Sequence, residues 1–304
     1  MTDPTTGRLR VDGATLHYEV RGTGPLLLLI PGGAGDAASY DGIADDLAID
    51  HTVASYDPRG MSRSPLDDPE ATQQVAQHAD DAFRLLELLS PDTPARVAGC
   101  SSGAIVALHL LATHPGRVAR VVAHEPPVVE VLPDAAEHRA MLARVQDTFR
   151  RDGLMPAVAE FAAALSRPAD LSRAAGLNRP ATLSQPAGLS RSGAEKPVAA
   201  EAVIELPPRA AARAERTRAN MPYFLGRIVP SFMAYVPDLQ RLAALSDRLV
   251  LAGGADSRGE LPYRPAAFLA ERCGTELVHF PGGHIGLSTH PTEFGELLRK
   301  VLSA

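Results

Sequence analysis

The segment Gly99-Cys100-Ser101-Ser102-Gly103 has the pattern G-x-S-x-G, and its central serine could act as a nucleophile. A serine hydroxyl is weakly nucleophilic until a base removes its proton, and this pattern exposes the hydroxyl on a tight turn between a strand and a helix. Here a short apolar run precedes the pattern and an apolar-periodic segment follows it. We therefore interpret Ser101 as a candidate nucleophile; the alternative is a simple Gly/Ser turn.

A nucleophilic serine needs a histidine base, which in this pattern follows a later strand. His284 comes after the apolar run 277–280 and the turn Pro281-Gly282-Gly283, whose glycines can bring an imidazole back over the edge of a sheet. We therefore predict His284 as the base.

The base in turn needs a carboxylate that orients it, and two candidates follow strand-like runs. Asp256 comes after the run 249–252 and a Gly253-Gly254 turn, while Glu125 ends the run 118–123. We predict Asp256, because the glycines permit a tight turn and its side chain is the shorter one. Glu125 stays as the alternative acid, and otherwise we expect it to anchor the inserted segment that follows.

The reaction intermediate of such a site also needs backbone donors for its oxyanion. We predict the N–H of Ser102, directly after the nucleophile, and the N–H of Gly33 in the glycine-rich loop after residues 26–30. That loop lacks both the glycine spacing and the lysine of a phosphate cradle. Cys100 is expected to pack beneath the turn, and the spacing of Cys and His gives no support for a metal site.

These residues must be positioned by alternating strands and helices, which indicate an α/β fold with a mostly parallel sheet covered by helices. The apolar runs predict eight strands, at 9–11, 16–20, 26–30, 52–55, 96–99, 118–123, 248–252 and 276–280. Helical spacing predicts helices near 39–48, 71–89, 103–114, 265–272 and 292–303.

The helix predicted at 71–89 illustrates the amphipathic pattern. Apolar residues recur every three or four positions, with acidic residues outside the stripe that faces the sheet. The stripe contains Ala76, Ala79, Phe83, Leu86 and Leu89, and the residues expected outside it are Asp80, Asp81 and Glu87. We also expect His78 to lie at the surface.

The strand pattern stops between residues 126 and 236, which predicts a helical cap inserted between two parts of one core, 1–125 and 237–304. Within the cap, leucine recurs every six residues over 165–194. Each repeat has one large apolar side chain, too few to offset the entropy of ordering, so we expect this repeat to be disordered.

Composition excludes several other classes of protein. The chain has 304 residues, Lys+Arg 30 against Asp+Glu 36, and a net charge of −6. It offers no basic field for nucleic acid or anionic lipid, and its apolar runs are shorter than the ~20 residues of a membrane span. With two cysteines and no signal peptide, we expect a cytoplasmic protein whose partner is a small-molecule substrate. The oligomeric state is not predicted.

With these residues in place, the chain resembles the α/β-hydrolase fold family, in particular its cap-bearing esterases, lactonases and cofactor-free perhydrolases. The resemblance covers about residues 8–125 and 237–304. It includes Ile30-Pro31-Gly32-Gly33, where such proteins usually carry His-Gly, and the turn Asp57-Pro58-Arg59-Gly60-Met61-Ser62-Arg63-Ser64, where Ser62 replaces a usual glycine. Serine rather than aspartate at position 101 argues against dehalogenases and epoxide hydrolases.

The resemblance implies a serine hydrolase that cleaves a carboxylic ester or lactone through an acyl-enzyme, with Ser101, His284 and Asp256 as triad and no cofactor. The same residues would serve peracid formation, C–C bond cleavage or hydroxynitrile lysis, and a non-catalytic ligand-binding module is the remaining alternative. The cap would line a hydrophobic pocket, for which the candidates are Met141, Phe149, Phe161, Met221, Tyr223, Phe224, Phe232 and Met233. These eight could equally form the core of the cap.

Overall fold

A computed structural model describes residues 3–166 and 207–303. Its centre is an eight-stranded sheet in the order β1-β2-β4-β3-β5-β6-β7-β8. β1 and β2 form an antiparallel hairpin, β2 is antiparallel to β4, and all later pairs are parallel. The strands are β1 (Thr5–Val11), β2 (Ala14–Arg21), β3 (Leu26–Ile30), β4 (Thr52–Tyr56), β5 (Ala95–Cys100), β6 (Val118–His124), β7 (Leu249–Gly254) and β8 (Leu277–Phe280). The predicted mostly parallel sheet of eight strands is confirmed.

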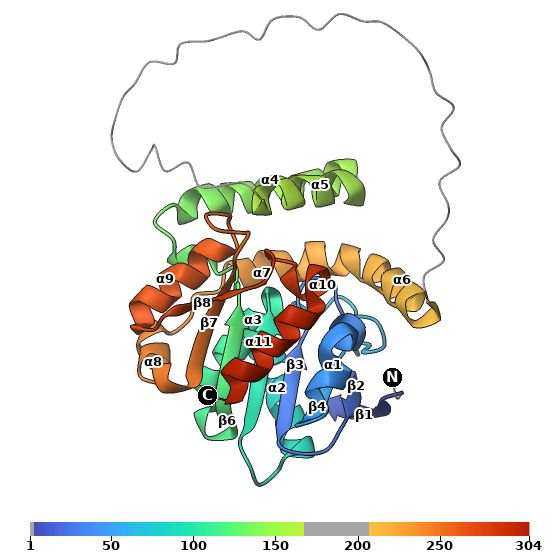
Figure 1. Ribbon diagram of the computed structural model, residues 1–304. Helices are drawn as coiled ribbons and strands as arrows, with labels where there is room; N and C mark the ends of the chain where they lie inside the picture. Colours follow the sequence, from blue (N-terminus) through green and yellow to red (C-terminus); the bar gives the residue numbers. More distant parts are fainter. Residues whose placement is uncertain (1–2, 167–206, 304) are drawn as a thin grey trace, which may run out of the picture.

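Helices cover both faces of this sheet (Figure 1). One face packs against α1 (Asp41–Leu47) and α11 (Pro291–Ser303). The other face packs against α2 (Val75–Leu89), α3 (Ser102–Thr113), α8 (Leu239–Ala243) and α9 (Tyr263–Cys273). The short helix α10 (Gly286–Thr289) follows β8.

The central strand β3 shows why the sequence folds into these layers. All five of its residues are buried apolar side chains. Successive side chains of a strand point to opposite faces. Leu26, Leu28 and Ile30 therefore join the core beneath α2 and α3, whereas Leu27 and Leu29 join the core beneath α1 and α11.

Of the helices that the structure describes between β6 and β7, four group at one end of the sheet (Figure 1). They are α4 (Ala135–Asp152), α5 (Leu154–Leu165), α6 (Pro208–Tyr223) and α7 (Val229–Met233), with a π-helical segment, η4 (Phe224–Ile228), joining the last two. They fall within the predicted cap, 126–236. Of the predicted repeat at 165–194, only Leu165 and Ser166 belong to the described residues.

The helix predicted at 71–89 begins at Val75, and its buried face differs from the predicted one. Asp81, expected at the surface, is fully buried, and both its oxygens accept hydrogen bonds from the buried Arg59 guanidinium. His78, also expected at the surface, is buried and hydrogen-bonded to Gln73 at 3.1 Å. Both expectations were wrong: Arg59 reaches Asp81 from the loop after β4, and Gln73 lies just before the helix begins.

No helix in the ranges 3–166 and 207–303 is both long and apolar enough to cross a membrane. Cys100 and Cys273 are both free thiols.

Candidate active site

Ser101 stands on a sharp turn between β5 and α3, with φ 54° and ψ −124°. A positive φ is costly for a residue with a side chain, and such strain concentrates at functional sites. The flanking glycines are steric requirements. A Cβ on Gly99 would lie 2.3 Å from the carbonyl oxygen of Gly103, and a Cβ on Gly103 would lie 2.3 Å from that of Ile30. The strand-turn-helix predicted around Ser101 is therefore present.

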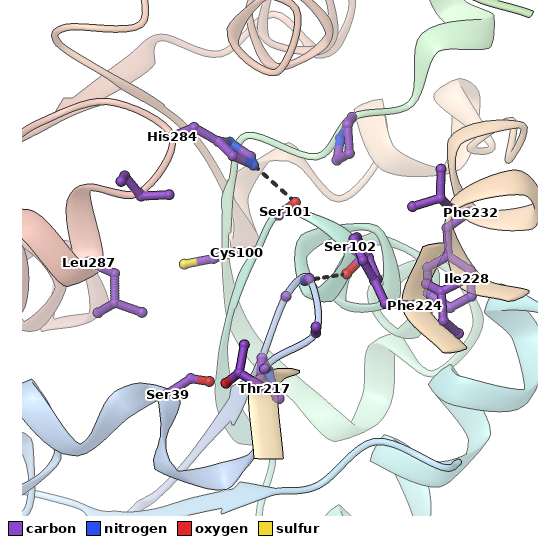
Figure 2. A pocket seen from close by; sticks show the side chains of 18 of the residues that line it. Ser39, Cys100, Ser101, Ser102, Thr217, Phe224, Ile228, Phe232, His284 and Leu287 are labelled. Atoms are coloured by element: carbon purple, nitrogen blue, oxygen red, sulfur yellow. Dashed lines mark hydrogen bonds between the residues drawn. The ribbon is translucent and has the colours of Figure 1, made fainter. Parts of the chain in front are cut away.

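His284 lies in the loop after β8 and faces Ser101. Its Nε2 is 3.1 Å from Oγ of Ser101, which is hydrogen-bond distance (Figure 2). The His284 side chain is 19% exposed, so it remains accessible from the pocket. The structure thus brings together the two residues that the sequence predicted as nucleophile and base.

The carboxylate next to His284 belongs to Glu125 and not to Asp256. Oε2 of Glu125 lies 2.8 Å from Nδ1 of His284, and the Glu125 side chain is completely buried. Asp256 is exposed, and its side chain forms no hydrogen bond within the described ranges. The prediction that Asp256 contacts His284 is therefore contradicted, and the alternative, Glu125, occupies that place.

Local geometry explains why Glu125, and not Asp256, lies next to His284. Glu125 has φ 48°, a second strained residue at the end of a strand, and this conformation turns its side chain back over the sheet edge. Its Oε1 accepts the N–H of Gly254 at 2.7 Å and the hydroxyl of the buried Ser257. The loop after β7, predicted to supply the acid, instead holds it in place. No local pattern in the sequence pointed to Ser257.

The electrostatic setting keeps Glu125 ionised. Burial raises the pKa of a carboxyl, but hydrogen bonds from His284 and Ser257 and the nearby imidazoles outweigh it, so the pKa of Glu125 lies below its ordinary value. Burial raises the pKa of the neighbouring Cys100 thiol to about 12, which keeps it protonated. Figure 2 shows the Cys100 sulfur pointing away from the Ser101 hydroxyl.

The two predicted oxyanion donors flank Ser101. In the described part of the chain, the N–H of Ser102 donates no hydrogen bond to another protein group. The N–H of Gly33, whose φ is 61°, donates to Oγ of Ser102 at 3.0 Å (Figure 2). The Gly33 N–H, which we predicted to bind an oxyanion, is therefore hydrogen-bonded to the Ser102 hydroxyl.

The profile of the alpha/beta hydrolase fold matches residues 25–291. The chain belongs to the alpha/beta hydrolase fold family. The uncharacterized hydrolase YraK of Bacillus subtilis (strain 168) is 33% identical over 300 residues, 97% of this chain and 95% of that protein. A zearalenone hydrolase of Bionectria ochroleuca is 35% identical over 118 residues, 38% of this chain and 45% of that protein. The solved enol-lactonase of Burkholderia xenovorans LB400 shares the fold, with a TM-score of 0.67, 15% identity, and coverage of 98% of this chain and 100% of that one.

This hydrolase has a pocket of about 410 Å³ over the Ser101 hydroxyl. Most of its wall is apolar, and the inserted helices supply much of that surface (Figure 2). Four of the eight predicted candidates line it, namely Phe161, Phe224, Phe232 and Met233. Of the other four, Met141 belongs to the buried core, and Phe149, Met221 and Tyr223 are partly buried and pack against it.

The hydrolase has a further strained residue at Ser62, where the resemblance implied glycine and φ is 48°. Its hydroxyl donates to Asp36 at 3.2 Å and accepts from the amide of Asn220 at 2.9 Å. Asn220 belongs to α6, so the strained Ser62 ties this inserted helix to the core of the hydrolase.

Over 3–166 and 207–303, no group of three His, Cys, Asp or Glu side chains converges as metal ligands would.

Proposed function

We propose that this hydrolase cleaves a carboxylic ester or lactone of a hydrophobic small molecule through an acyl-enzyme on Ser101. In this proposal His284 is the general base, Glu125 orients it, and backbone N–H groups of Ser102 and Gly33 hold the oxyanion.

In the first step Oγ of Ser101 attacks the carbonyl carbon while Nε2 of His284 takes the serine proton. Glu125, ionised and fixed by its three donors, stabilises the imidazolium through Nδ1. The negative charge moves to the carbonyl oxygen, and this oxygen accepts a hydrogen bond from the Ser102 N–H. A turn of the Ser102 side chain releases the Gly33 N–H to the same oxygen.

In the second step the tetrahedral intermediate collapses, the C–O bond to the alcohol breaks, and His284 returns the proton to the leaving oxygen. Water then attacks the acyl-enzyme, with His284 again taking a proton, and releases the acid and the free Ser101 hydroxyl. In a lactone the alcohol and the acid belong to the same product molecule.

The observation that carries this proposal is the continuous chain of hydrogen bonds from Ser101 through His284 to the buried Glu125, at 3.1 and 2.8 Å. Both ends of that chain are held by residues with positive φ, a cost that a binding module would have no reason to bear. This geometry favours catalysis over a non-catalytic ligand-binding role.

The apolar wall of the pocket supports a hydrophobic substrate. The partial similarity to a zearalenone hydrolase also supports hydrolysis as the reaction.

The proposal is tested with a panel of p-nitrophenyl esters and lactones of graded chain length, run beside acetate with peroxide and a 1,3-diketone. We expect hydrolysis of esters or lactones, fastest for medium-length apolar acyl groups. Turnover of the diketone or formation of peracid without ester cleavage would contradict it.

A further inference from the structure

One arginine of α6 lines the substrate pocket and has no acidic partner among the described residues. Arg209, Arg213 and Arg216 are spaced by four and three residues on α6, so they share one face of that helix. Arg209 pairs with Glu19 and Asp41, and Arg216 pairs with Asp36. Between them, Arg213 forms no ion pair with any described residue, and its hydrogen bond to the carbonyl of Ala38 is long, at 3.4 Å.

Arg213 lines the pocket and is half-buried. Among the lining residues that the structure describes, it alone carries a permanent charge. A guanidinium that is partly removed from water and has no carboxylate beside it is costly, unless a ligand supplies the missing negative charge.

Two hydroxyl groups lie beside it, and with Arg213 they form what we term the polar corner: Ser39, Arg213 and Thr217. Thr217 is one helical turn from Arg213, and Ser39 follows Ala38, whose carbonyl Arg213 contacts. Figure 2 shows the Ser39 and Thr217 hydroxyls facing one another at the end of the pocket away from His284.

The polar corner is rich in donors. Oγ of Ser39 already accepts the N–H of Asp36 at 3.1 Å, so its proton is left to donate. Asp36 already accepts hydrogen bonds from Arg216, from the N–H of Ala38 and from the Ser62 hydroxyl. A planar guanidinium with adjacent hydroxyl donors matches the two oxygens of a carboxylate.

We propose that the pocket selects esters or lactones carrying a carboxylate, which binds the polar corner while the scissile carbonyl reaches Ser101. This inference rests on the proposed hydrolase function and deepens it. The preferred substrates are then half-esters of dicarboxylic acids, or lactones with a carboxylate side chain, joined through an apolar middle that fits the wall of the pocket.

The test compares two p-nitrophenyl esters that differ only in charge, p-nitrophenyl hydrogen adipate and its neutral methyl ester, with succinate and suberate analogues to vary the length. The release of p-nitrophenolate gives kcat/KM for each. We expect the wild type to prefer the anionic ester by about tenfold or more at one length, as charge-assisted hydrogen bonds imply. In Arg213→Met this ratio should fall to about one, mainly through KM.

The matched control is Arg218→Met, on the same helix, because Arg218 is exposed and lies outside the pocket lining. It removes the same charge and should keep the wild-type ratio. A wild-type preference for the neutral ester, or a ratio unchanged in Arg213→Met, would overturn the inference.

A binding measurement separates this inference from the proposed chemistry. Calorimetry with Ser101→Ala should show tighter binding of the anionic ester than of the neutral one, and Ser101→Ala/Arg213→Met should lose that difference. If no ester is cleaved but this difference in binding appears, the chemistry is wrong and the polar corner stands. If esters are cleaved without any difference, only the polar corner is wrong.

Discussion

Glu125 and His284 are 159 residues apart in the chain, yet Oε2 of the first lies 2.8 Å from Nδ1 of the second. The acid therefore follows β6, and its other two donors come from the last residue of β7, Gly254, and from Ser257 in the loop after β7. The carboxylate thus comes from the end of β6, and the end of the adjacent parallel strand β7 holds it in place.

Exchanging Glu125 for its amide tests this arrangement. Glu125→Gln should lower kcat by roughly 10³ to 10⁴, because the amide cannot stabilise the imidazolium and favours the wrong tautomer. Asp256→Asn is the matched control, and it should keep activity within about threefold because Asp256 is exposed. Steady-state kinetics on the best p-nitrophenyl ester measures both. The reverse pattern, with activity lost only in Asp256→Asn, would refute the role of Glu125.

Ser257 acts on the reaction through Glu125, so its removal should affect kcat and not KM. Ser257→Ala deletes a hydrogen bond to a charged group, and we expect kcat to fall roughly tenfold. That hydrogen bond helps to lower the pKa of Glu125, so its loss should raise this pKa and move the acid limb of the kcat profile to higher pH. A lower melting temperature with an unchanged pH profile would mean that Ser257 is only structural.

His124 makes the stability of the fold sensitive to acid. Its imidazole is buried between Phe280 and Phe294, neither ring nitrogen has a hydrogen-bond partner in the described part of the chain, and burial lowers its pKa to about 4 from 6.5. The unfolded chain therefore binds a proton more readily between pH 6.5 and 4, and stability falls as the pH drops through that window. At pH 5 the loss from this group is about 2 kcal/mol relative to pH 7.5.

His124→Phe should remove that component of the pH dependence, because phenylalanine has no proton to gain. Urea unfolding at pH 5 and pH 7.5 gives the free energy of unfolding for both proteins. An equal loss of stability in wild type and variant would show that His124 does not titrate as its burial implies.

The stability of the fold should also depend on the buried ion pair of Arg59 and Asp81. Arg59→Met leaves Asp81 buried without its partner, which we expect to cost about 3–5 kcal/mol of unfolding free energy. Arg59→Met/Asp81→Leu removes both charges and should recover most of that loss. If the double variant is no more stable than the single one, packing and not charge explains the effect.

Local signals in the sequence were sufficient for Ser101 and His284. The spacing of glycines around Ser101 and the strand before His284 are properties of short segments, and a parallel sheet brings the ends of its strands to one edge. The same reasoning predicted all eight strands, because most are short apolar runs between turns and the first two form a hairpin of closely spaced runs.

The acid could not be chosen in this way. Asp256 and Glu125 both follow strands, and the choice depends on the positive φ of Glu125 and on the inward position of Ser257, which are set by contacts between β6 and β7. Asp81 was misplaced for a similar reason, since its partner Arg59 lies in a separate loop. Arg213 could not be predicted as a pocket residue either, because α6 meets the pocket only after the whole chain has folded.

The most direct test of the central claim is the site of covalent labelling by a fluorophosphonate, mapped by mass spectrometry of the digested protein. We predict one label on Ser101 in the wild type, no label in Ser101→Ala, and slow labelling in Glu125→Gln. A label on Ser102, or equal labelling of wild type and Ser101→Ala, would contradict it.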